Sequence, residues 1–183
     1  MAESRYLEKP WLKSYEKGVP ASIQYEEICL PDILDRTAKN FPEKPALLFQ
    51  GTTVNYRQFK EMVDRFAACL ADFGVGKGDA VAILLPNTIP CVVAYYAILK
   101  VGGITVMNNP LYSDPELEHQ FNDSGSKVLI TLDVLANRMV ALRAKTKIKQ
   151  IVYTSIGDYL PAVKRVLGKW LKKYPFGEVK AAP

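Results

Sequence analysis

The chain has 183 residues and a net charge of +5, and 49% of its residues are hydrophobic while 23% are charged. This balance is typical of one globular domain and excludes an intrinsically disordered chain. No apolar signal-peptide core follows Met1, and the longest apolar run, Ile89–Leu99, is about half of the ~20 residues that a membrane-spanning helix needs. We therefore expect a cytoplasmic protein.

The cysteine pattern also favours a reducing compartment. Cys29, Cys69 and Cys91 are odd in number, lie far apart and form no Cys-x-x-Cys pair. Such a pattern predicts neither a disulfide framework nor a zinc site. We interpret the three residues as core thiols.

The first 45 residues are predicted to form an extended arm and a short helix. Residues 1–30 mix aromatic and charged residues around prolines and glycines, and we interpret them as an arm lying over a larger body. Pro31 begins a helix that runs to Asn40, because proline suits a first helical turn. The prolines of Phe41–Pro45 then end it.

Residues 46–157 alternate between strand and helix patterns and are predicted to form one lobe. Gln50-Gly51 is a two-residue hairpin signal, and Asn55 with Gln58 has the spacing of a capping box. The predicted strands are Ala46–Phe49, Thr52–Val54, Ala80–Leu85, Ile104–Met107, Val128–Thr131 and Gln150–Thr154. The predicted helices are an amphipathic one carrying Phe59 to Leu70, then Thr88–Val101, Ser113–Asn122 and Asp133–Lys145.

This alternation predicts the fold class. The apolar runs Ala80–Leu85 and Ile104–Met107 are typical of strands buried on both faces, and the helix Thr88–Val101 is apolar nearly all round. Strands separated by helices imply right-handed β-α-β crossovers. We expect an α/β fold, doubly wound, with a largely parallel sheet and flanking helices.

Residues 158–183 are predicted to form a basic amphipathic helix and a tail. Residues 1–137 contain 13 Lys and Arg against 17 Asp and Glu, whereas residues 138–183 contain 11 against 2. Between Val163 and Tyr174 the apolar residues recur at helical spacing. The cations and the tryptophan that could contact a membrane surface are Lys164, Arg165, Lys169, Trp170, Lys172 and Lys173.

Three interpretations of this helix stay open. It is a packed surface helix with solvated charges, a membrane-surface helix, or an element that binds nucleic acid or a partner helix. No aromatic platform or groove-reading motif supports the nucleic-acid role, so we expect no nucleic-acid partner.

Two glycine-containing loops resemble nucleotide sites only superficially. A phosphate loop follows a strand and opens a helix, whereas Gly74–Gly78 follows a helix and opens a strand. Thr154–Gly157 follows a strand but has no glycine directly after Ser155 and no lysine close downstream. We interpret the first as a helix stop and the second as a strand end with a turn.

The single histidine does not indicate an active site. His119 lies in an acidic, capped helix, and no other His or Cys is near it in sequence to share a metal. The sequence therefore predicts no catalytic, cofactor-binding or metal-binding residue in this chain. A small Rossmann-type nucleotide binder is disfavoured because no glycine fingerprint lies at a strand-to-helix turn.

A series of short motifs resembles the adenylate-forming (AMP-binding) acyl-CoA synthetase superfamily. Their order and spacing make the resemblance specific, and it covers about Trp11 to Tyr174. The opening Trp11–Tyr15 with Gly18-Val19-Pro20 is similar to the long-chain fatty-acid branch. One small departure is Asp114-Pro115, where the family places Pro directly after the hydroxyl cap. The matching segments are Phe41–Ala46, Gly74–Asp79, Leu85–Asn87, Ala97–Gly103, Asn109–Tyr112, Glu116–Gln120 and Asn122–Gly125.

The resemblance implies a function for a longer protein. Such enzymes use ATP, Mg and CoA to convert a fatty acid to acyl-CoA through an acyl-adenylate, and this chain would be the first lobe of their large domain. The family's phosphate loop, adenine-stacking segment, ribose-binding Asp and mobile-domain lysine come after this region. We therefore expect an N-terminal fragment that binds no cofactor and is inactive alone. The alternative is a non-catalytic α/β binding module that docks on a membrane or partner through its basic helix, and a homodimer is also possible.

Overall fold

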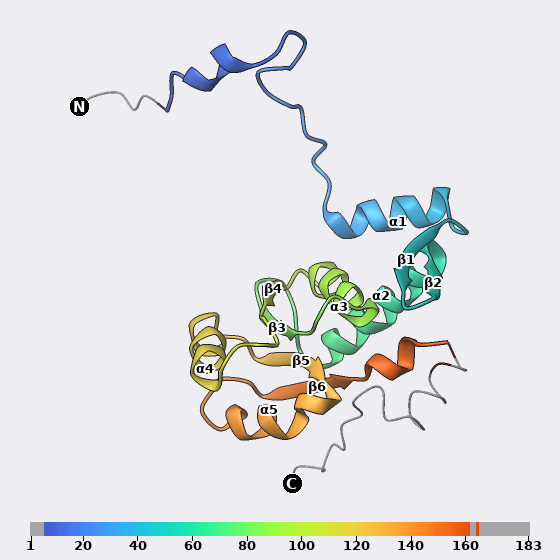
Figure 1. Ribbon diagram of the computed structural model, residues 1–183, viewed down its shortest axis with the longest axis vertical. Coiled ribbons are helices and arrows are strands. Elements are labelled where there is room, and N and C mark those ends of the chain that lie inside the picture. The colour runs from blue at the N-terminus through green and yellow to red at the C-terminus, as the bar shows by residue number, and fades with distance from the viewer. Residues whose placement is uncertain (1–5, 162–163, 165–183) are drawn as a thin grey trace, which may run out of the picture.

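The computed structural model describes residues 6–161 and 164 (Figure 1). The α-helices and β-strands of the described residues lie between residues 30 and 161, and the first segment, residues 6–29, extends away from them. The described part of the chain contains no helix that is both long and apolar enough to cross a membrane. Of the predicted basic helix, only Lys164 is described; the remainder, including Trp170, lies outside the described residues.

The arm differs from its predicted placement. Residues 6–29 contain one short 3-10 helix, η1 (Pro10–Ser14), and nearly all of their side chains are exposed. Figure 1 shows this segment extending away from the lobe instead of lying over it. The predicted helix after it is confirmed as α1 (Leu30–Asn40), whose Leu34 and Ala38 are buried.

A hairpin and a long helix come next, as predicted. β1 (Pro45–Phe49) pairs antiparallel with β2 (Thr52–Asn55), and Gln50 and Gly51 both adopt positive φ in the turn. α2 (Tyr56–Asp72) begins with the predicted capping box: Gln58 N donates to Asn55 Oδ1 at 2.9 Å, and Asn55 N donates to Gln58 Oε1 at 3.0 Å. The amphipathic face buries Phe59, Val63, Ala67 and Leu70.

Four parallel strands form the central sheet, in the order β4-β3-β5-β6. The strands are β3 (Ala80–Leu84), β4 (Ile104–Met107), β5 (Val128–Leu132) and β6 (Gln150–Thr154). The connecting helices are α3 (Ile89–Lys100), α4 (Asp114–Asp123) and α5 (Ala136–Arg143), the last preceded by the 3-10 turn η2 (Asp133–Leu135). The 3-10 turn η3 (Ile156–Tyr159) follows β6.

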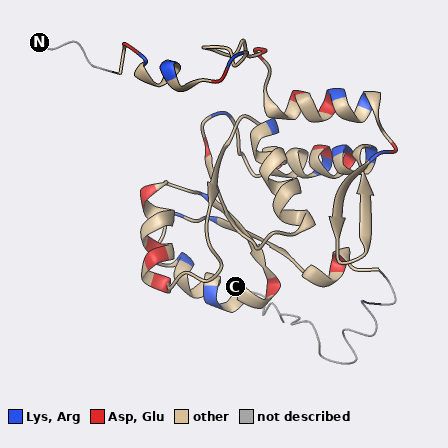
Figure 2. Cartoon of the chain, turned by 45° about the horizontal axis from the view of Figure 1, so that its top comes forward, with Lys and Arg blue, Asp and Glu red and all other residues tan. Residues whose placement is uncertain are grey.

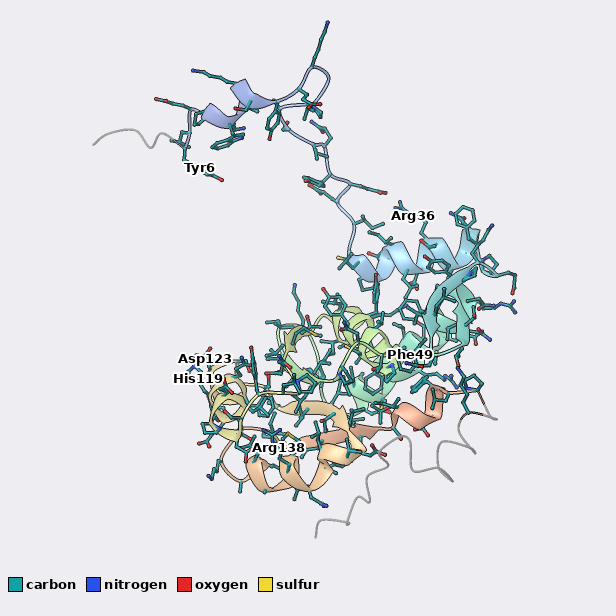
Figure 3. All side chains as sticks on the ribbon, in the orientation of Figure 1. Tyr6, Arg36, Phe49, His119, Asp123 and Arg138 are labelled. Atoms are coloured by element: carbon teal, nitrogen blue, oxygen red, sulfur yellow. The ribbon has the colours of Figure 1, made fainter. Side chains whose placement is uncertain are left out.

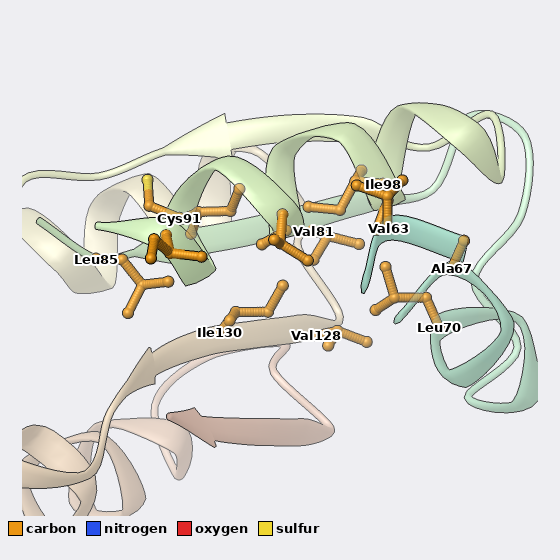
Figure 4. Packing of buried hydrophobic residues seen from close by; sticks show 14 of the residues in the cluster. Val63, Ala67, Leu70, Val81, Leu85, Cys91, Ile98, Val128 and Ile130 are labelled. Carbon is orange, nitrogen blue, oxygen red and sulfur yellow. The ribbon is translucent and has the colours of Figure 1, made fainter. Parts of the chain in front are cut away.

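Helices cover both faces of this sheet, which confirms the doubly wound architecture. On one face, α2 and α3 pack on alternate residues of β3 and β5, including Val81, Val128 and Ile130 (Figure 4). On the other face, α4 and α5 bury Ala82, Leu84 and Leu129 against residues such as Phe121 and Met139. The alternation of side chains along each strand separates these two hydrophobic clusters.

Two predictions for the sheet need correction. β4 is an edge strand instead of an inner one: Ile104 and Met107 are 53% and 51% exposed. The predicted helix Asp133–Lys145 is not one helix but the short turn η2 followed by α5. The apolar helix is buried as expected, because α3 lies between β3 and α2 and encloses Ala94, Ala97 and Ile98 fully.

Candidate functional site

The order of the strands points to the carboxyl edge of the sheet. From β3 the chain passes through α3 to β4 on one side, and from β4 it returns to β5 on the other side of β3. The carboxyl ends of β3 and β5 therefore flank the point where the winding reverses. In open α/β sheets, ligands bind at this position.

Buried polar side chains shape the strand ends there. Thr131 Oγ1 donates to the carbonyl of Leu84 at 3.3 Å, which ties β5 to the end of β3. Asn108 follows β4, and its Nδ2 donates to the carbonyl of Val106 at 2.8 Å. Thr88 precedes α3, and its Oγ1 donates to Pro86 O at 3.0 Å. All three are buried and bonded to backbone, so they position loops.

A groove of about 410 Å³ opens beside this edge, on the sheet face that carries α2. Side chains from α2, the start of α3 and the strands β5 and β6 line it. Its polar members are Arg65, on α2, Tyr153 and Thr154, at the end of β6, and Tyr159, in η3. Its apolar members are Met62, Phe66, Pro90, Val93, Ile130 and Val152.

The polar groups of this groove meet near one hydroxyl. Burial raises the pKa of Tyr159, and the neighbouring charge of Asp158 raises it further. Two effects lower the pKa of Tyr159: a hydrogen bond with the Thr154 side chain and the positive charge of Arg65. They are smaller than the effects that raise it, so the net pKa of Tyr159 is raised. Tyr159 is therefore a neutral phenol at physiological pH. Within the described residues, Arg65 forms no ion pair.

Hydrogen bonds to the hairpin hold the segment that follows β6. Thr52 Oγ1 donates to the carbonyl of Tyr159 at 2.8 Å, and Lys164 Nζ donates to the carbonyl of Gln50 at 2.6 Å. The hairpin thereby fixes the wall of the groove that carries Tyr159. Lys164, one of the cations predicted for a membrane contact, contacts the hairpin turn here.

A second charged cluster joins the first three helices. Lys100 Nζ on α3 lies 2.9 Å from Asp35 Oδ1 on α1 and 2.6 Å from Asp64 Oδ1 on α2. Lys60 Nζ contacts Asp64 Oδ2 at 2.5 Å and lies 3.7 Å from Asp35. Burial raises the pKa of Asp64, but hydrogen bonds with Lys100 and Lys60 outweigh it, so the net pKa is lowered. The four charges balance, which indicates a structural role.

Of the features that the sequence singled out, Gly74–Gly78 and His119 lie outside the groove, whereas Thr154 of the segment Thr154–Gly157 lines it. Gly74 has φ +77° and ends α2, and Val75 N donates to Leu70 O at 3.0 Å, which confirms a helix stop. Ser155 Oγ accepts from Gly157 N at 3.3 Å, which confirms a turn after the strand. His119 is exposed on α4, whose acidic residues are red in Figure 2. It lies on the opposite side of the lobe from Phe49 of the hairpin (Figure 3).

No group of three or more His, Cys, Asp or Glu side chains that could hold a metal occurs in the described part of the chain. Sequence reasoning did not identify Arg65 or Tyr159, because neither lies in a motif and the two are far apart in sequence. The only available signal was that Arg65 is on a predicted helix and Tyr159 follows a predicted strand.

Comparisons with known proteins agree with the fold. The family described as AMP-binding enzyme matches residues 34–177. A long-chain-fatty-acid–CoA ligase of Bacillus subtilis (strain 168) is 38% identical over 160 residues, which is 87% of this chain and 29% of that protein. A ligase of the same description from Yersinia pestis is 34% identical over 92% of this chain and 30% of its own length. This chain thus spans about 30% of the length of these relatives.

Solved structures extend the similarity to three dimensions. A long-chain-fatty-acid–CoA ligase from Archaeoglobus fulgidus superposes with a TM-score of 0.69 and 27% identity, over 92% of this chain and 35% of that one. An anthranilate–CoA ligase in complex with anthranoyl-AMP gives a TM-score of 0.68 and 25% identity, over 89% of this chain and 30% of that one. The family match covers residues 34–177, more than half of the chain, and the TM-scores show that the fold is shared with these structures. The chain belongs to the AMP-binding enzyme family.

Proposed function

We propose that this chain is the amino-terminal part of a long-chain fatty-acid–CoA ligase. In the whole protein, a fatty acid and ATP would form an acyl-adenylate and pyrophosphate, and CoA would then displace AMP to give acyl-CoA. The observation that carries this proposal is the 38% identity over 160 residues to a ligase of that description. The parallel sheet, in which the winding reverses between β3 and β5, supports it.

The lobe contributes scaffold to this reaction. The described residues provide neither a metal-binding cluster nor a glycine loop between a strand and a helix, so ATP, Mg and CoA would be held by other parts of the whole enzyme. We assign no catalytic residue in this chain and propose that it is inactive alone. We also propose the division into an arm with its helix (1–45), the α/β lobe (46–157) and a basic tail (158–183).

The experiment compares the natural protein with the 183-residue chain. The natural protein is captured from its source with an antibody raised against the lobe, and its intact mass is measured. Both proteins are then assayed for pyrophosphate release and palmitoyl-CoA formation from palmitate, ATP, Mg and CoA. We expect a natural mass roughly three times that of this chain and activity only in the natural protein.

Two outcomes would contradict the proposal. A natural protein that has the mass of this chain and no ligase activity would favour a binding module. Release of pyrophosphate by the pure 183-residue chain would show that the lobe is catalytic. Acetate and anthranilate serve as alternative acids, and preference for either over palmitate would change the substrate class.

A location in the cytoplasm, peripheral membrane contact and a homodimer remain parts of the proposal. Cys91 is buried but Cys29 is exposed, so the prediction of three core thiols is wrong for Cys29. The absence of a disulfide among the three supports a reducing compartment. The membrane contact rests on the basic stretch from Lys164 to Lys173 and its aromatic residue. Binding to anionic vesicles should weaken with salt and after charge reversal at Lys169, Lys172 and Lys173. Sedimentation of the natural protein tests the homodimer.

A further inference from the structure

A second, apolar groove lies between β1 and the start of α3, and we call it the hairpin groove. It has a volume of about 300 Å³. Its lining residues are Ala46–Phe49, Asn87–Ile89, Cys91 and Val92, and none of these carries a charge. Leu48 is 76% exposed although its side chain is large and apolar. A groove with this lining is suited to apolar side chains.

The path of the chain leads toward this groove. After β6, Pro161 lines a hollow beside β2 together with Thr52–Val54. Lys164 then donates from Nζ to the carbonyl of Gln50, in the hairpin turn, at 2.6 Å. The chain thus passes from β2 to the turn, and β1, one wall of the hairpin groove, lies on the other side of that turn.

The sequence that follows Lys164 carries apolar side chains at helical spacing. In residues 166–174 the residues that share one helical face are Val166, Leu167, Trp170, Leu171 and Tyr174, while the cations occupy other positions. At 1.5 Å per residue, a helix of this length extends about 14 Å. The five residues of β1 extend about 17 Å, so the apolar face and the strand are matched in length.

We propose that residues 166–174 pack as a helix in the hairpin groove, with Trp170 against Leu48 and the cations toward solvent. The tether at Lys164 favours this occupant, because a short connection holds the segment at an effective concentration in the millimolar range. A separate molecule would have to reach that concentration in solution. The uncharged lining fits the apolar face, and the lysines on the other face keep their hydration.

This packing goes beyond the proposed ligase function and concerns contacts within this chain alone. It also decides between two of the interpretations of the basic segment. One apolar face cannot pack on the lobe and enter a lipid surface at the same time. In the free chain, therefore, the face is covered by the hairpin groove and is withheld from a membrane.

Trp170 serves as the reporter in the 183-residue chain. The only other tryptophan is Trp11, on the arm, so Trp11→Phe leaves a single indole. In this variant we expect acrylamide to quench Trp170 about threefold less than in the urea-unfolded chain, because a packed indole is shielded from solvent. Its emission maximum should lie at a shorter wavelength than in the unfolded chain.

Matched leucine variants locate the contact. Leu48→Gln, added to Trp11→Phe, should raise the quenching of Trp170 toward the value of the unfolded chain, because it makes the groove more polar. Leu111→Gln is the control, since Leu111 is 89% exposed and lies in the loop after β4, outside the hairpin groove. It should leave the quenching unchanged. Circular dichroism checks that both variants are folded.

A second measurement leaves the lobe unaltered. Trp170→Ala removes the indole ring, whose magnetic field shifts the NMR signals of methyl groups in contact with it. We expect the methyl signals of Leu48 and Val92 to move in this variant, and those of Leu111 to stay in place.

Four results would overturn the proposal. The first is quenching of Trp170 that is as strong in the folded chain as in the unfolded chain, and the second is unchanged quenching in Leu48→Gln. The third is shielding of Trp170 that increases with protein concentration, which would assign the face to a second copy. The fourth is shielding that appears only after phosphatidylglycerol vesicles are added, which would assign it to a membrane. None of these measurements involves ligase activity, so the ligase proposal stands or fails separately.

Discussion

The hydroxyl of Thr52 in β2 donates a hydrogen bond to the backbone carbonyl of Tyr159, 107 residues later in the chain. This contact joins the hairpin at the beginning of the lobe to the turn that follows its last strand. Because the carbonyl is partly buried, loss of the donor would leave it without a partner.

Thr52→Val should therefore lower the free energy of unfolding by about 1 kcal/mol, in the range for a lost hydrogen bond. The neighbouring Thr53 is exposed, so Thr53→Val is the control and should be nearly neutral. Urea denaturation of both variants provides the measurement. Equal stability of the two would show that the bond between Thr52 and Tyr159 contributes nothing.

The cluster of Asp35, Lys60, Asp64 and Lys100 should make the lobe sensitive to acid. The pKa of Asp64 is lowered below its ordinary value of 3.8 in the folded state, so the folded protein binds its proton less readily than the unfolded chain does. The resulting stabilisation is complete above the unfolded pKa. It is lost as pH falls from about 5 through the folded pKa of Asp64.

Asp64→Asn should lower the free energy of unfolding at neutral pH by roughly 1 kcal/mol, the upper value for partly exposed ion pairs. Below about pH 5, the free energy of unfolding should fall less steeply with pH in this variant than in the wild type. Glu61→Gln changes an exposed carboxylate on the same helix and is the control. It should leave the pH dependence of the free energy of unfolding unchanged. Urea titrations at a series of pH values give both slopes. A parallel decline in wild type and Asp64→Asn would contradict the assignment.

Two isoleucines provide a test of the sheet order. Ile98 on α3 is fully buried, whereas Ile104 on the edge strand β4 is 53% exposed. Ile98→Ala should cost about 2–5 kcal/mol, as large-to-small changes in cores do. Ile104→Ala should cost well under half of that, since substitutions at exposed sites are usually within about 0.5 kcal/mol. Equal costs, by urea denaturation, would place β4 inside the sheet.

Glycine substitutions test the close packing around Gly103, which lies between α3 and β4. A Cβ on Gly103 would lie 3.0 Å from a side-chain carbon of Ile98 and 3.2 Å from the backbone oxygen of Asp79. Gly103→Ala should therefore destabilise the lobe by about 1–3 kcal/mol, the usual cost of overpacking. At Gly76 the nearest atom is 4.0 Å away, so Gly76→Ala should be neutral or stabilise by up to about 1 kcal/mol. Thermal unfolding gives the melting temperature of each variant. A melting temperature that is lower for Gly76→Ala than for Gly103→Ala would contradict this packing.

Local features of this fold followed directly from the sequence. The capping residues Asn55 and Gln58, the Gln50-Gly51 turn and the glycine stop at Gly74 all form as predicted. Each depends on residues within a few positions of one another, so the pattern and the structure are set together. The prediction that the chain holds no catalytic residue stays a prediction.

The sequence by itself determined the elements, the buried character of α3 and the membership of a family, because periodicity, caps and motif order are properties of consecutive residues. Only the tertiary structure decided that Ile104–Met107 lies at an edge, since an apolar run looks the same in an edge strand and an inner strand. The tertiary structure also brought Arg65, Thr154 and Tyr159 together. Their proximity depends on how β6 pairs with β5 and where η3 meets the hairpin, and those contacts join residues distant in the chain.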